Sequence, residues 1–235
     1  MFLSAQARTM TGNGSTGPHS DRMKPRSAKP VPRGREGSVR IIGGRWRGTR
    51  LPVADAPGLR PTSDRARETL FNWLQPMLPG ARVLDLFAGS GALGLEALSR
   101  GAREALLVER DPRLVDSLHA AVERLHARDE AKPLRADALA LLAAPLHGRF
   151  DLVFVDPPFA EGLWDAVLAA LPSWLAEGAW LYLESPADRP VDPGPGWRLH
   201  REGRSRDARH ALFRRAAGGA DTLAQAPDDG ATNLP

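Results

Sequence analysis

The sequence contains no cysteine and no long apolar run. The absence of cysteine excludes disulfides, thiolate nucleophiles and cysteine-based zinc sites, and it suits a reducing compartment. No apolar run approaches the length of a membrane span, and residues 1–10 lack the apolar core of a secretory signal. The six histidines show no metal-ligand spacing. We therefore expect a cytoplasmic protein with no membrane segment and no bound metal.

Acidic side chains are scarce at the start of the chain. Residues 1–50 hold eleven Lys and Arg against two acidic residues, a net charge of +9, whereas the whole chain carries +4. A basic arm on a mildly acidic body suggests a polyanionic partner. Residues 1–37 and 217–235 are low in complexity, and we expect both to be disordered tails. The remaining length allows one substantial α/β domain with an extension.

Residues 83–94 form the motif around which the chain is organised. A short apolar strand leads into a glycine-rich turn, and an amphipathic run follows over residues 92–100. Gly89, Gly91 and Gly94 have the spacing of a nucleotide-binding turn, in which glycine lets the backbone approach a ligand closely. A dinucleotide site and a tight turn without a ligand both fit this motif when it is taken alone.

A second motif, Asp156-Pro157-Pro158-Phe159, follows a predicted strand over residues 150–155. Two prolines remove two backbone donors and fix the direction of the chain. A carboxylate and carbonyl oxygens then remain as acceptors beside an aromatic ring. Such a segment is unusual for packing alone, and it favours a functional interpretation of the glycine turn.

Strands and helices alternate along the rest of the sequence. The pattern predicts a parallel sheet with helices on both faces, and ligands bind such sheets at the carboxyl ends of the strands. The predicted strands span residues 83–86, 104–108, 132–136, 150–155 and 179–184, with a terminal antiparallel pair at 197–204 and 208–215. The predicted helices span residues 63–78, 92–100, 112–128, 138–146 and 163–175. The strand at 208–215 is unusually polar, which leaves its pairing in doubt.

Acidic residues end four of these strands, namely Asp85, Glu109, Asp137 and Asp156. Four carboxylates would repel a phosphate-rich dinucleotide, but they suit a ligand with a ribose, an adenine amine and a positive centre. This favours S-adenosylmethionine over NAD. The sequence also lacks the Tyr-x-x-x-Lys pair that is usual in NAD-dependent oxidoreductases, because Tyr182 is the only tyrosine and Lys132 is the last lysine. This argues against an oxidoreductase.

An arginine-rich hairpin is predicted over residues 39–51, with the returning strand from Arg45 to Leu51. Four arginines fall within eleven residues and flank a tryptophan, a composition that suits phosphate contact and base stacking. The candidate RNA-binding residues are Arg40, Arg45, Trp46, Arg47 and Arg50. The alternative is an ordinary exposed hairpin in which Trp46 fills part of the core.

These motifs resemble those of class I S-adenosylmethionine-dependent methyltransferases. Residues 40–48, 58–74 and 87–100 resemble most closely the bacterial 16S rRNA guanine-N2 methyltransferases that act on the small ribosomal subunit. The resemblance covers about residues 38–215. It implies an α/β, Rossmann-like fold with a mostly parallel seven-stranded sheet, helices on both faces and an N-terminal β-hairpin extension. The extension would span residues 38–80 and the cofactor-binding domain residues 81–216.

The resemblance also implies a reaction, namely methyl transfer from S-adenosylmethionine to N2 of one guanine in 16S rRNA. The rRNA would be part of the small ribosomal subunit or of its assembly intermediate, and the sequence does not distinguish free rRNA from an assembled particle as the substrate. Asp156 and the Pro157 carbonyl would accept the amine hydrogens, Pro158 would complete the turn, and Phe159 would stack on the base. The residues implied at the cofactor are Arg60, Thr62, Asp85, Phe87, Ala88, Gly89, Ser90, Gly91, Glu109, Arg110, Asp137 and Ala138. Among them, Glu109 would hold the ribose and Asp137 the adenine.

Two other functions stay open at this point. A methyltransferase acting on another amine, such as adenine N6 in DNA or glutamine in a protein, would use a similar turn. A non-catalytic rRNA-binding assembly factor could keep the fold, although the intact glycine turn and the intact Asp156 motif argue against it. We expect a monomer.

Overall fold

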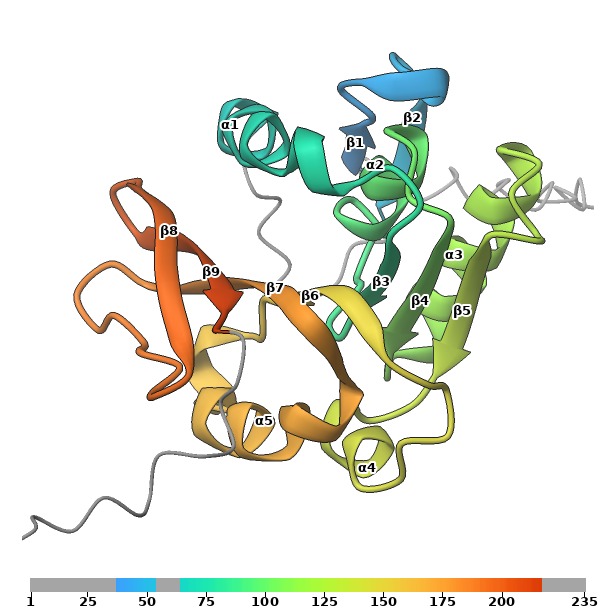
Figure 1. The fold of residues 1–235 in the computed structure, drawn as a ribbon. Coiled ribbons are helices and arrows are strands. Elements are labelled where there is room, and N and C mark those ends of the chain that lie inside the picture. The colour runs from blue at the N-terminus through green and yellow to red at the C-terminus, as the bar shows by residue number, and fades with distance from the viewer. Residues whose placement is uncertain (1–36, 54–63, 217–235) are drawn as a thin grey trace, which may run out of the picture. The chain divides into compact units, whose positions relative to one another are not determined.

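The computed structural model describes residues 37–53 and 64–216 (Figure 1). The two tails expected to be disordered lie outside the described residues, apart from Gly37. Arg60 and Thr62, two of the residues expected at the cofactor, also lie outside them.

A seven-stranded sheet forms the centre of the described chain. Its strands are β3 (Arg82–Asp85), β4 (Glu104–Glu109), β5 (Ala131–Arg135), β6 (Phe150–Val155), β7 (Leu175–Pro186), β8 (Trp197–Arg204) and β9 (Ala208–Arg215). The spatial order is β5-β4-β3-β6-β7-β9-β8. The first five of these are mutually parallel, whereas β9 runs antiparallel to both of its neighbours. The predicted mostly parallel, seven-stranded sheet is therefore confirmed.

Five α-helices lie between the strands in the described part of the chain, and all five are shorter than predicted. They are α1 (Asp64–Leu74), α2 (Gly94–Ser99), α3 (Pro112–Arg124), α4 (Ala138–Leu142) and α5 (Trp164–Ala170). Pro76 and Pro172 turn the last parts of two predicted helices into 3-10 turns, η2 (Gln75–Met77) and η4 (Leu171–Trp174). α3 stops early because His126 adopts a left-handed conformation with φ of 53°. None of the described helices is long and apolar enough to cross a membrane.

Helices cover both faces of the sheet, as predicted. Alternate residues of β6 belong to different apolar clusters, since side chains point to opposite faces along a strand. Phe154 packs in the cluster that includes residues of α1, α2 and α3, whereas Val153 and Val155 pack in the cluster that includes residues of α4 and α5. In Figure 1, α1 and α2 accordingly lie above the sheet and α4 and α5 below it.

The polar strand β9 pairs with both neighbours over its whole length, so its predicted pairing is confirmed. Its buried polar residues have partners. Arg209 donates Nε to Glu202 Oε2 at 2.9 Å and Nη1 to the Val191 carbonyl at 3.1 Å. His210 Nδ1 lies 2.8 Å from the Tyr182 hydroxyl. These hydrogen bonds explain why polar residues are tolerated in a buried strand.

The N-terminal hairpin differs from the prediction. β1 (Gly37–Arg40) and β2 (Arg50–Val53) pair as a separate two-stranded sheet, and the expected returning strand from Arg45 does not form. Instead, Gly44–Trp46 forms a 3-10 turn, η1. The prediction missed this because the turn is stabilised by contacts with α2, which is more than forty residues away in the sequence.

Candidate functional site

The four acidic residues predicted at the ligand-binding edge lie on four adjacent strands. Asp85 and Glu109 end β3 and β4, Asp137 follows β5 after one residue, and Asp156 follows β6 directly. Because these strands are parallel neighbours in the order β5-β4-β3-β6, their carboxyl ends form one edge of the sheet. The structure therefore brings all four carboxylates to the same edge.

The glycine loop after β3 continues the sheet before it turns. Leu86 N–H donates to the Phe154 carbonyl at 3.2 Å, and Ala88 N–H donates to the Val108 carbonyl at 2.9 Å. Gly89 and Gly91 then have positive φ angles of 51° and 77°. Phe87 and Ser90 are partly exposed in this loop, whereas Ala88 is buried. Thus the loop is anchored to both flanking strands before it reaches the helix.

Two glycines of the motif also have a packing role. A Cβ atom on Gly91 would lie 2.7 Å from Leu118 Cδ2 and 2.8 Å from Leu95 Cδ1. A Cβ atom on Gly94 would lie 2.2 Å from Leu107 Cδ2. A side chain at either position would therefore have to displace these leucine methyl groups, and at Gly91 the positive φ disfavours any other residue as well.

Glu109 joins the glycine loop to the loop after β4. Its Oε2 accepts the N–H of Gly89 at 3.0 Å, and its Oε1 accepts the N–H of Asp111 at 2.8 Å. Asp137 caps α4, since its Oδ1 accepts the N–H of Ala140 at 3.0 Å, and the residue itself is exposed. A carboxylate oxygen has more than one lone pair, so both side chains can accept further hydrogen bonds from a ligand.

Asp85 is 2% exposed, and its Oδ2 accepts the N–H of Gly94 at 3.0 Å. Burial raises the pKa of Asp85 to about 7, and the nearby charge of Glu109 adds to this, against the lowering by hydrogen bonds from the backbone of Gly94 and Phe87. This carboxyl group therefore changes its charge near neutral pH.

Asp156 is partly accessible at the end of β6. Burial of its carboxylate raises the pKa of Asp156 well above the ordinary value, and the charges of Glu184 and Asp85 raise it further. Within residues 37–53 and 64–216, no group donates a hydrogen bond to this carboxylate. Among the described residues, Asp156 is therefore an acceptor without a donor, in contrast to Asp85, Glu109 and Asp137.

The residues after Asp156 form a rigid turn. Pro157 is buried and Pro158 is exposed, and neither has a backbone N–H to donate. The Pro158 carbonyl accepts the N–H of Glu161 at 3.0 Å, which closes the 3-10 turn η3 (Phe159–Glu161). Phe159 is half-buried, with its ring centroid 5.8 Å from that of Trp164. Part of the Phe159 ring is thus covered by its contact with Trp164.

Arg110 contacts the same turn. Its guanidinium forms a two-point ion pair with Glu161, in which Nη1 lies 2.9 Å from Oε2. Because β4 and β6 lie on either side of β3, this ion pair bridges the carboxyl end of β3. Arg110, which the resemblance leads us to expect at the cofactor, therefore links the loop after β4 to the loop that carries Asp156.

Glu96 on α2, which the sequence analysis did not identify, attaches the N-terminal hairpin to the domain. Its carboxylate is fully buried and accepts the N–H of Ile42 at 2.7 Å, the N–H of Gly43 at 2.8 Å and Nε of Arg100 at 2.7 Å. A sequence signal existed, because Glu96 is the one charged residue in the apolar run of α2.

The two glycines at the tip of the hairpin allow this attachment. Gly44 has φ of 72°, and a Cβ atom there would lie 1.8 Å from the Ser99 carbonyl oxygen. The Ser99 hydroxyl donates to the Gly43 carbonyl at 2.6 Å and accepts the N–H of Trp46 at 3.0 Å. The Gly43-Gly44 pair is therefore required for close contact with the end of α2.

Arg45 and Trp46 lie at the edge of the sheet opposite to Asp156. The hairpin tip contacts Ser99 at the carboxyl end of α2, next to the start of β4. Arg45 Nη1 lies 3.0 Å from Oε1 of Glu130, the residue before β5. The Arg45 guanidinium also stacks over Trp46, with Cζ 4.1 Å from the ring centroid. Trp46 is half-buried against the apolar core, as the alternative interpretation expected. The structure does not bring these residues next to the catalytic candidates.

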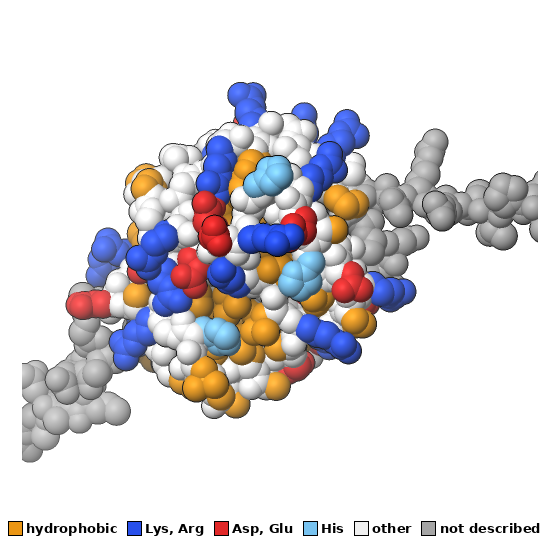
Figure 2. Space-filling model, turned by 90° about the vertical axis from the view of Figure 1, so that its right-hand side faces the viewer, with side chains coloured by type: hydrophobic (Ala, Val, Ile, Leu, Met, Phe, Trp, Pro, Cys, Tyr) orange, Lys and Arg blue, Asp and Glu red, His pale blue; other side chains and the backbone are white. Residues whose placement is uncertain are grey.

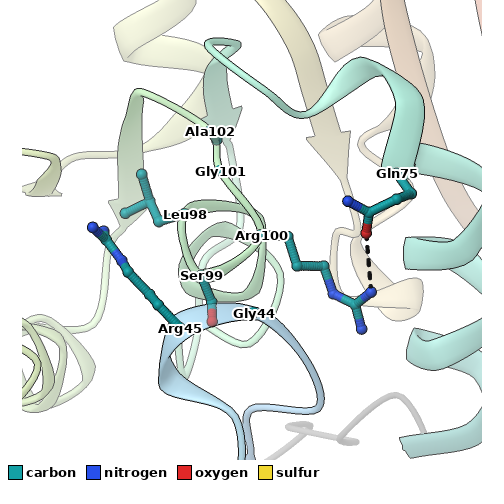
Figure 3. Close-up of a pocket in the computed structure, with 8 residues that line it drawn as sticks. All are labelled: Gly44, Arg45, Gln75, Leu98, Ser99, Arg100, Gly101 and Ala102. Carbon is teal, nitrogen blue, oxygen red and sulfur yellow. Dashed lines mark hydrogen bonds between the residues drawn. The ribbon is translucent and has the colours of Figure 1, made fainter.

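A hollow of about 540 Å³ adjoins this tip, lined by Gly44, Arg45, Gln75, Leu98, Ser99, Arg100, Gly101 and Ala102 (Figure 3). Figure 3 shows the side chains of Arg45 and Arg100 pointing away from each other, and Arg100 directed toward Gln75. The two guanidinium groups therefore do not converge on one anion.

On the face that carries α3 and β5, Lys and Arg side chains are interspersed with Asp and Glu side chains (Figure 2). Among the described residues, no cluster of His, Asp and Glu could hold a metal ion.

Comparisons with known proteins identify the family. The model of the family described as "Conserved hypothetical protein 95" matches residues 39–214. "Ribosomal RNA small subunit methyltransferase D" of Escherichia coli (strain K12) is 46% identical over 186 residues, which cover 78% of this chain and 93% of the relative. The protein with the same name from Haemophilus influenzae is 42% identical over 171 residues, which cover 71% of this chain and 89% of the relative.

Solved structures agree with this assignment. "Putative methyltransferase yhhF from Escherichia coli" superimposes with a TM-score of 0.69 at 46% identity, covering 77% of this chain and 99% of that one. The putative methylase HI0767 of Haemophilus influenzae superimposes with a TM-score of 0.66 at 35% identity and the same coverage. The residues matched by the family model, 39–214, include the hairpin, the glycine loop and the Asp156 turn. The chain therefore belongs to the conserved hypothetical protein 95 family, which includes the bacterial ribosomal RNA small subunit methyltransferases D.

Proposed function

We propose that this protein transfers a methyl group from S-adenosylmethionine to the exocyclic N2 amine of a guanine in 16S rRNA of the small ribosomal subunit. The observation that carries the proposal is Asp156, a carboxylate at the carboxyl edge of the sheet to which no group in residues 37–53 and 64–216 donates a hydrogen bond. It begins a turn whose two prolines offer only acceptors. The names of the family's relatives support an rRNA substrate.

The residues at the sheet edge fit S-adenosylmethionine. Glu109 and Asp137 present carboxylate oxygens that suit ribose hydroxyls and an adenine amine, and Asp85 holds the start of α2 through the N–H of Gly94. When bound, the cofactor supplies a methyl group activated by a positively charged sulfur. The acidic set at this edge attracts such a positive centre and repels a pyrophosphate.

Asp156 and Pro157 would act on the target amine. The lone pair of guanine N2 is delocalised into the ring, so the amine is a poor nucleophile. Two acceptors aimed at its hydrogens localise that lone pair on nitrogen, and the available acceptors are the Asp156 carboxylate and the Pro157 carbonyl, since the Pro158 carbonyl is occupied by Glu161. The carboxylate also stabilises the positive charge that develops on the nitrogen. The target base must leave its stack to reach them.

The hairpin would contact RNA at a distance from the reacting base. A six-residue strand such as β6 is about 20 Å long, so this length separates the hairpin tip from Asp156 across the sheet. Arg40, Arg47 and Arg50 are exposed there and could contact the phosphates of a neighbouring RNA segment. Single-stranded loops offer the most accessible target bases.

The test is incubation of the purified protein with a radiolabelled methyl donor and small ribosomal subunits from a strain that lacks the enzyme. The RNA is then digested to nucleosides. We expect the label in N2-methylguanosine, and none with the Asp156→Ala variant as a control.

Other outcomes would contradict the proposal in distinct ways. Label in methyladenosine or in ribosomal protein would move the target to another amine. Absence of label with both subunits and free rRNA, despite measured cofactor binding, would favour a non-catalytic role in subunit assembly.

A further inference from the structure

A buried polar cluster lies next to the Asp156 turn, and the reaction described above does not use it. Tyr182 and Glu184 are two residues apart on β7 and therefore point to the same face of the sheet. His210 on β9 is paired with Glu184. All three side chains are buried, with exposures of 0% for Tyr182, 8% for Glu184 and 9% for His210.

Hydrogen bonds join the three residues. The Tyr182 hydroxyl donates to Glu184 Oε2 at 3.0 Å and lies 2.8 Å from His210 Nδ1. His210 Nδ1 is also 3.3 Å from Glu184 Oε2. Burial and the charges of Glu184 and Asp156 raise the pKa of Tyr182 well above its ordinary value, so the phenol keeps its proton. It then donates to Glu184 and accepts from His210.

This cluster continues into the Asp156 site. β6 and β7 are parallel, and their register pairs Val155 with Leu183, so Asp156 and Glu184 follow side by side at the carboxyl ends of the two strands. The charge of Glu184 is, after burial, the largest influence on the carboxyl group of Asp156. α5 also contacts the cluster, because Trp164 Nε1 donates to the Glu184 carbonyl oxygen at 2.8 Å.

The two neighbouring carboxylates have unequal surroundings. Glu184 accepts a hydrogen bond from Tyr182, which favours its charged form, whereas no described group donates to Asp156. When two carboxylates interact, a shared proton resides on the one whose charge is less stabilised. That carboxylate is Asp156, the residue that faces the target amine in the proposed function.

We propose that Glu184, oriented by Tyr182 and His210, is a positioning residue that makes Asp156 the proton acceptor of the methyl transfer. In this step the N2 lone pair forms the new N–C bond as the methyl–sulfur bond breaks and its electrons return to sulfur. The nitrogen then carries one proton too many, and the Asp156 carboxylate takes it. The proton leaves to solvent through the accessible part of Asp156. This inference rests on the proposed function.

The experiment compares pH profiles of kcat for the wild type and Glu184→Gln on a 16S rRNA fragment, from pH 5 to pH 9. Asp85 also titrates in this range and bears on cofactor binding, so the cofactor is kept saturating. In the wild type, activity rises with pH as Asp156 loses its proton. Removing the neighbouring charge makes Asp156 a stronger acid. The rising limb of the variant is therefore expected to move by about one unit to lower pH, with a lower plateau because the base is weaker.

Further variants distinguish an effect of Glu184 on the charge of Asp156 from a purely structural role of the cluster. Tyr182→Phe is expected to shift the limb in the same direction, because Glu184 without its donor takes more of the shared proton. Glu177→Gln, an exposed carboxylate near the other end of β7, is the matched control and should leave the profile unchanged. Cofactor affinity should stay within about twofold in all three variants.

Three outcomes overturn the inference, and they are distinguishable. If the wild type makes no N2-methylguanosine, the proposed function fails and the inference fails with it. If the wild type makes it but the profiles of Glu184→Gln and Tyr182→Phe superimpose on that of the wild type, only the inference fails. A loss of activity without any shift of the limb equally means that the cluster is structural support.

Discussion

The carboxylate of Glu96 accepts the backbone N–H of Gly43 at 2.8 Å, across 53 residues of sequence. Glu96 belongs to α2, the helix that follows the glycine loop, and Gly43 belongs to the tip of the arginine-rich hairpin. A second bond, from the N–H of Ile42, completes a two-point attachment at 2.7 Å. One buried side chain thus connects the extension to the helix that follows the glycine loop.

Glu96→Ala is expected to destabilise the protein by about 2–4 kcal/mol, because it removes the acceptor of two buried N–H groups and leaves Arg100 without its ion pair. This corresponds to a fall in Tm of roughly 5–10 °C, measured by calorimetry. Trypsin should cleave faster at Arg45 and Arg47 once the hairpin is released. Glu68→Ala, which removes an exposed helical glutamate, is the control. Equal Tm values for the two variants would show that the attachment contributes nothing.

Asp156→Ala is expected to lower kcat by roughly 100- to 1000-fold, since it removes the carboxylate that faces the developing positive charge. The Kd of S-adenosylmethionine should change little, because Asp156 is assigned to the amine and not to the cofactor. Thermal stability should not fall, since the raised pKa shows that the charge is unfavourable in the folded state. Asp188→Ala, in the exposed loop after β7, is the control. Turnover of Asp156→Ala at the wild-type rate would disprove the assignment.

Phe159→Ala is expected to lower kcat/KM for RNA about tenfold or more, because stacking of a base on an aromatic ring contributes about 1–3 kcal/mol. Phe159 also packs against Trp164, so stability falls as well. Phe159→Leu separates the two effects, since it keeps apolar packing but offers no flat ring. A defect confined to the Ala variant would assign Phe159 to packing, and a large change in cofactor Kd would assign it to the cofactor side.

Asp85→Asn is expected to stabilise the protein in a pH-dependent way. Burial raises the pKa of Asp85 from 3.8 to about 7, so the folded state holds a proton that the unfolded state has lost. Wild-type stability therefore decreases as pH rises from about 4 to 7. At pH 8 the variant should have a higher Tm than the wild type, and its free energy of unfolding should be larger by roughly 2–4 kcal/mol. This difference in free energy should shrink as pH falls toward 4. A difference independent of pH would contradict this account. Asn keeps the acceptor for Gly94, but the cofactor should bind more weakly.

Arg47→Gln is expected to reduce the salt dependence of RNA binding by about one phosphate contact, a change of roughly 0.7–0.9 in the slope of log K against log salt. Arg45→Gln should change the slope less, because Arg45 is paired with Glu130 and stacked on Trp46. Arg198→Gln, on the exposed strand β8, is the control. Identical slopes for all three variants and the wild type would show that the hairpin does not contact the RNA backbone.

Local sequence patterns predicted the sheet well because they depend on neighbouring residues. An apolar run located β6 within its observed limits, and the polar pair β8 and β9 was also located correctly. The returning strand from Arg45 was wrong, since residues 44–46 form a 3-10 turn that is held by the side chain of Ser99. Helix ends were overextended wherever a proline or a left-handed residue stopped the helix.

The sequence by itself determined that four carboxylates share one edge of the sheet. Each ends or closely follows a strand, and parallel strands end at the same edge, so chain order was sufficient for Asp85, Glu109, Asp137 and Asp156. Only the tertiary structure decided the charge that these groups carry and the partners that they have. Glu184 lies beside Asp156 because β6 pairs with β7, and the hairpin tip lies at the far edge because it packs on the end of α2. Burial and through-space charge depend on residues distant in the chain, and no local pattern records them.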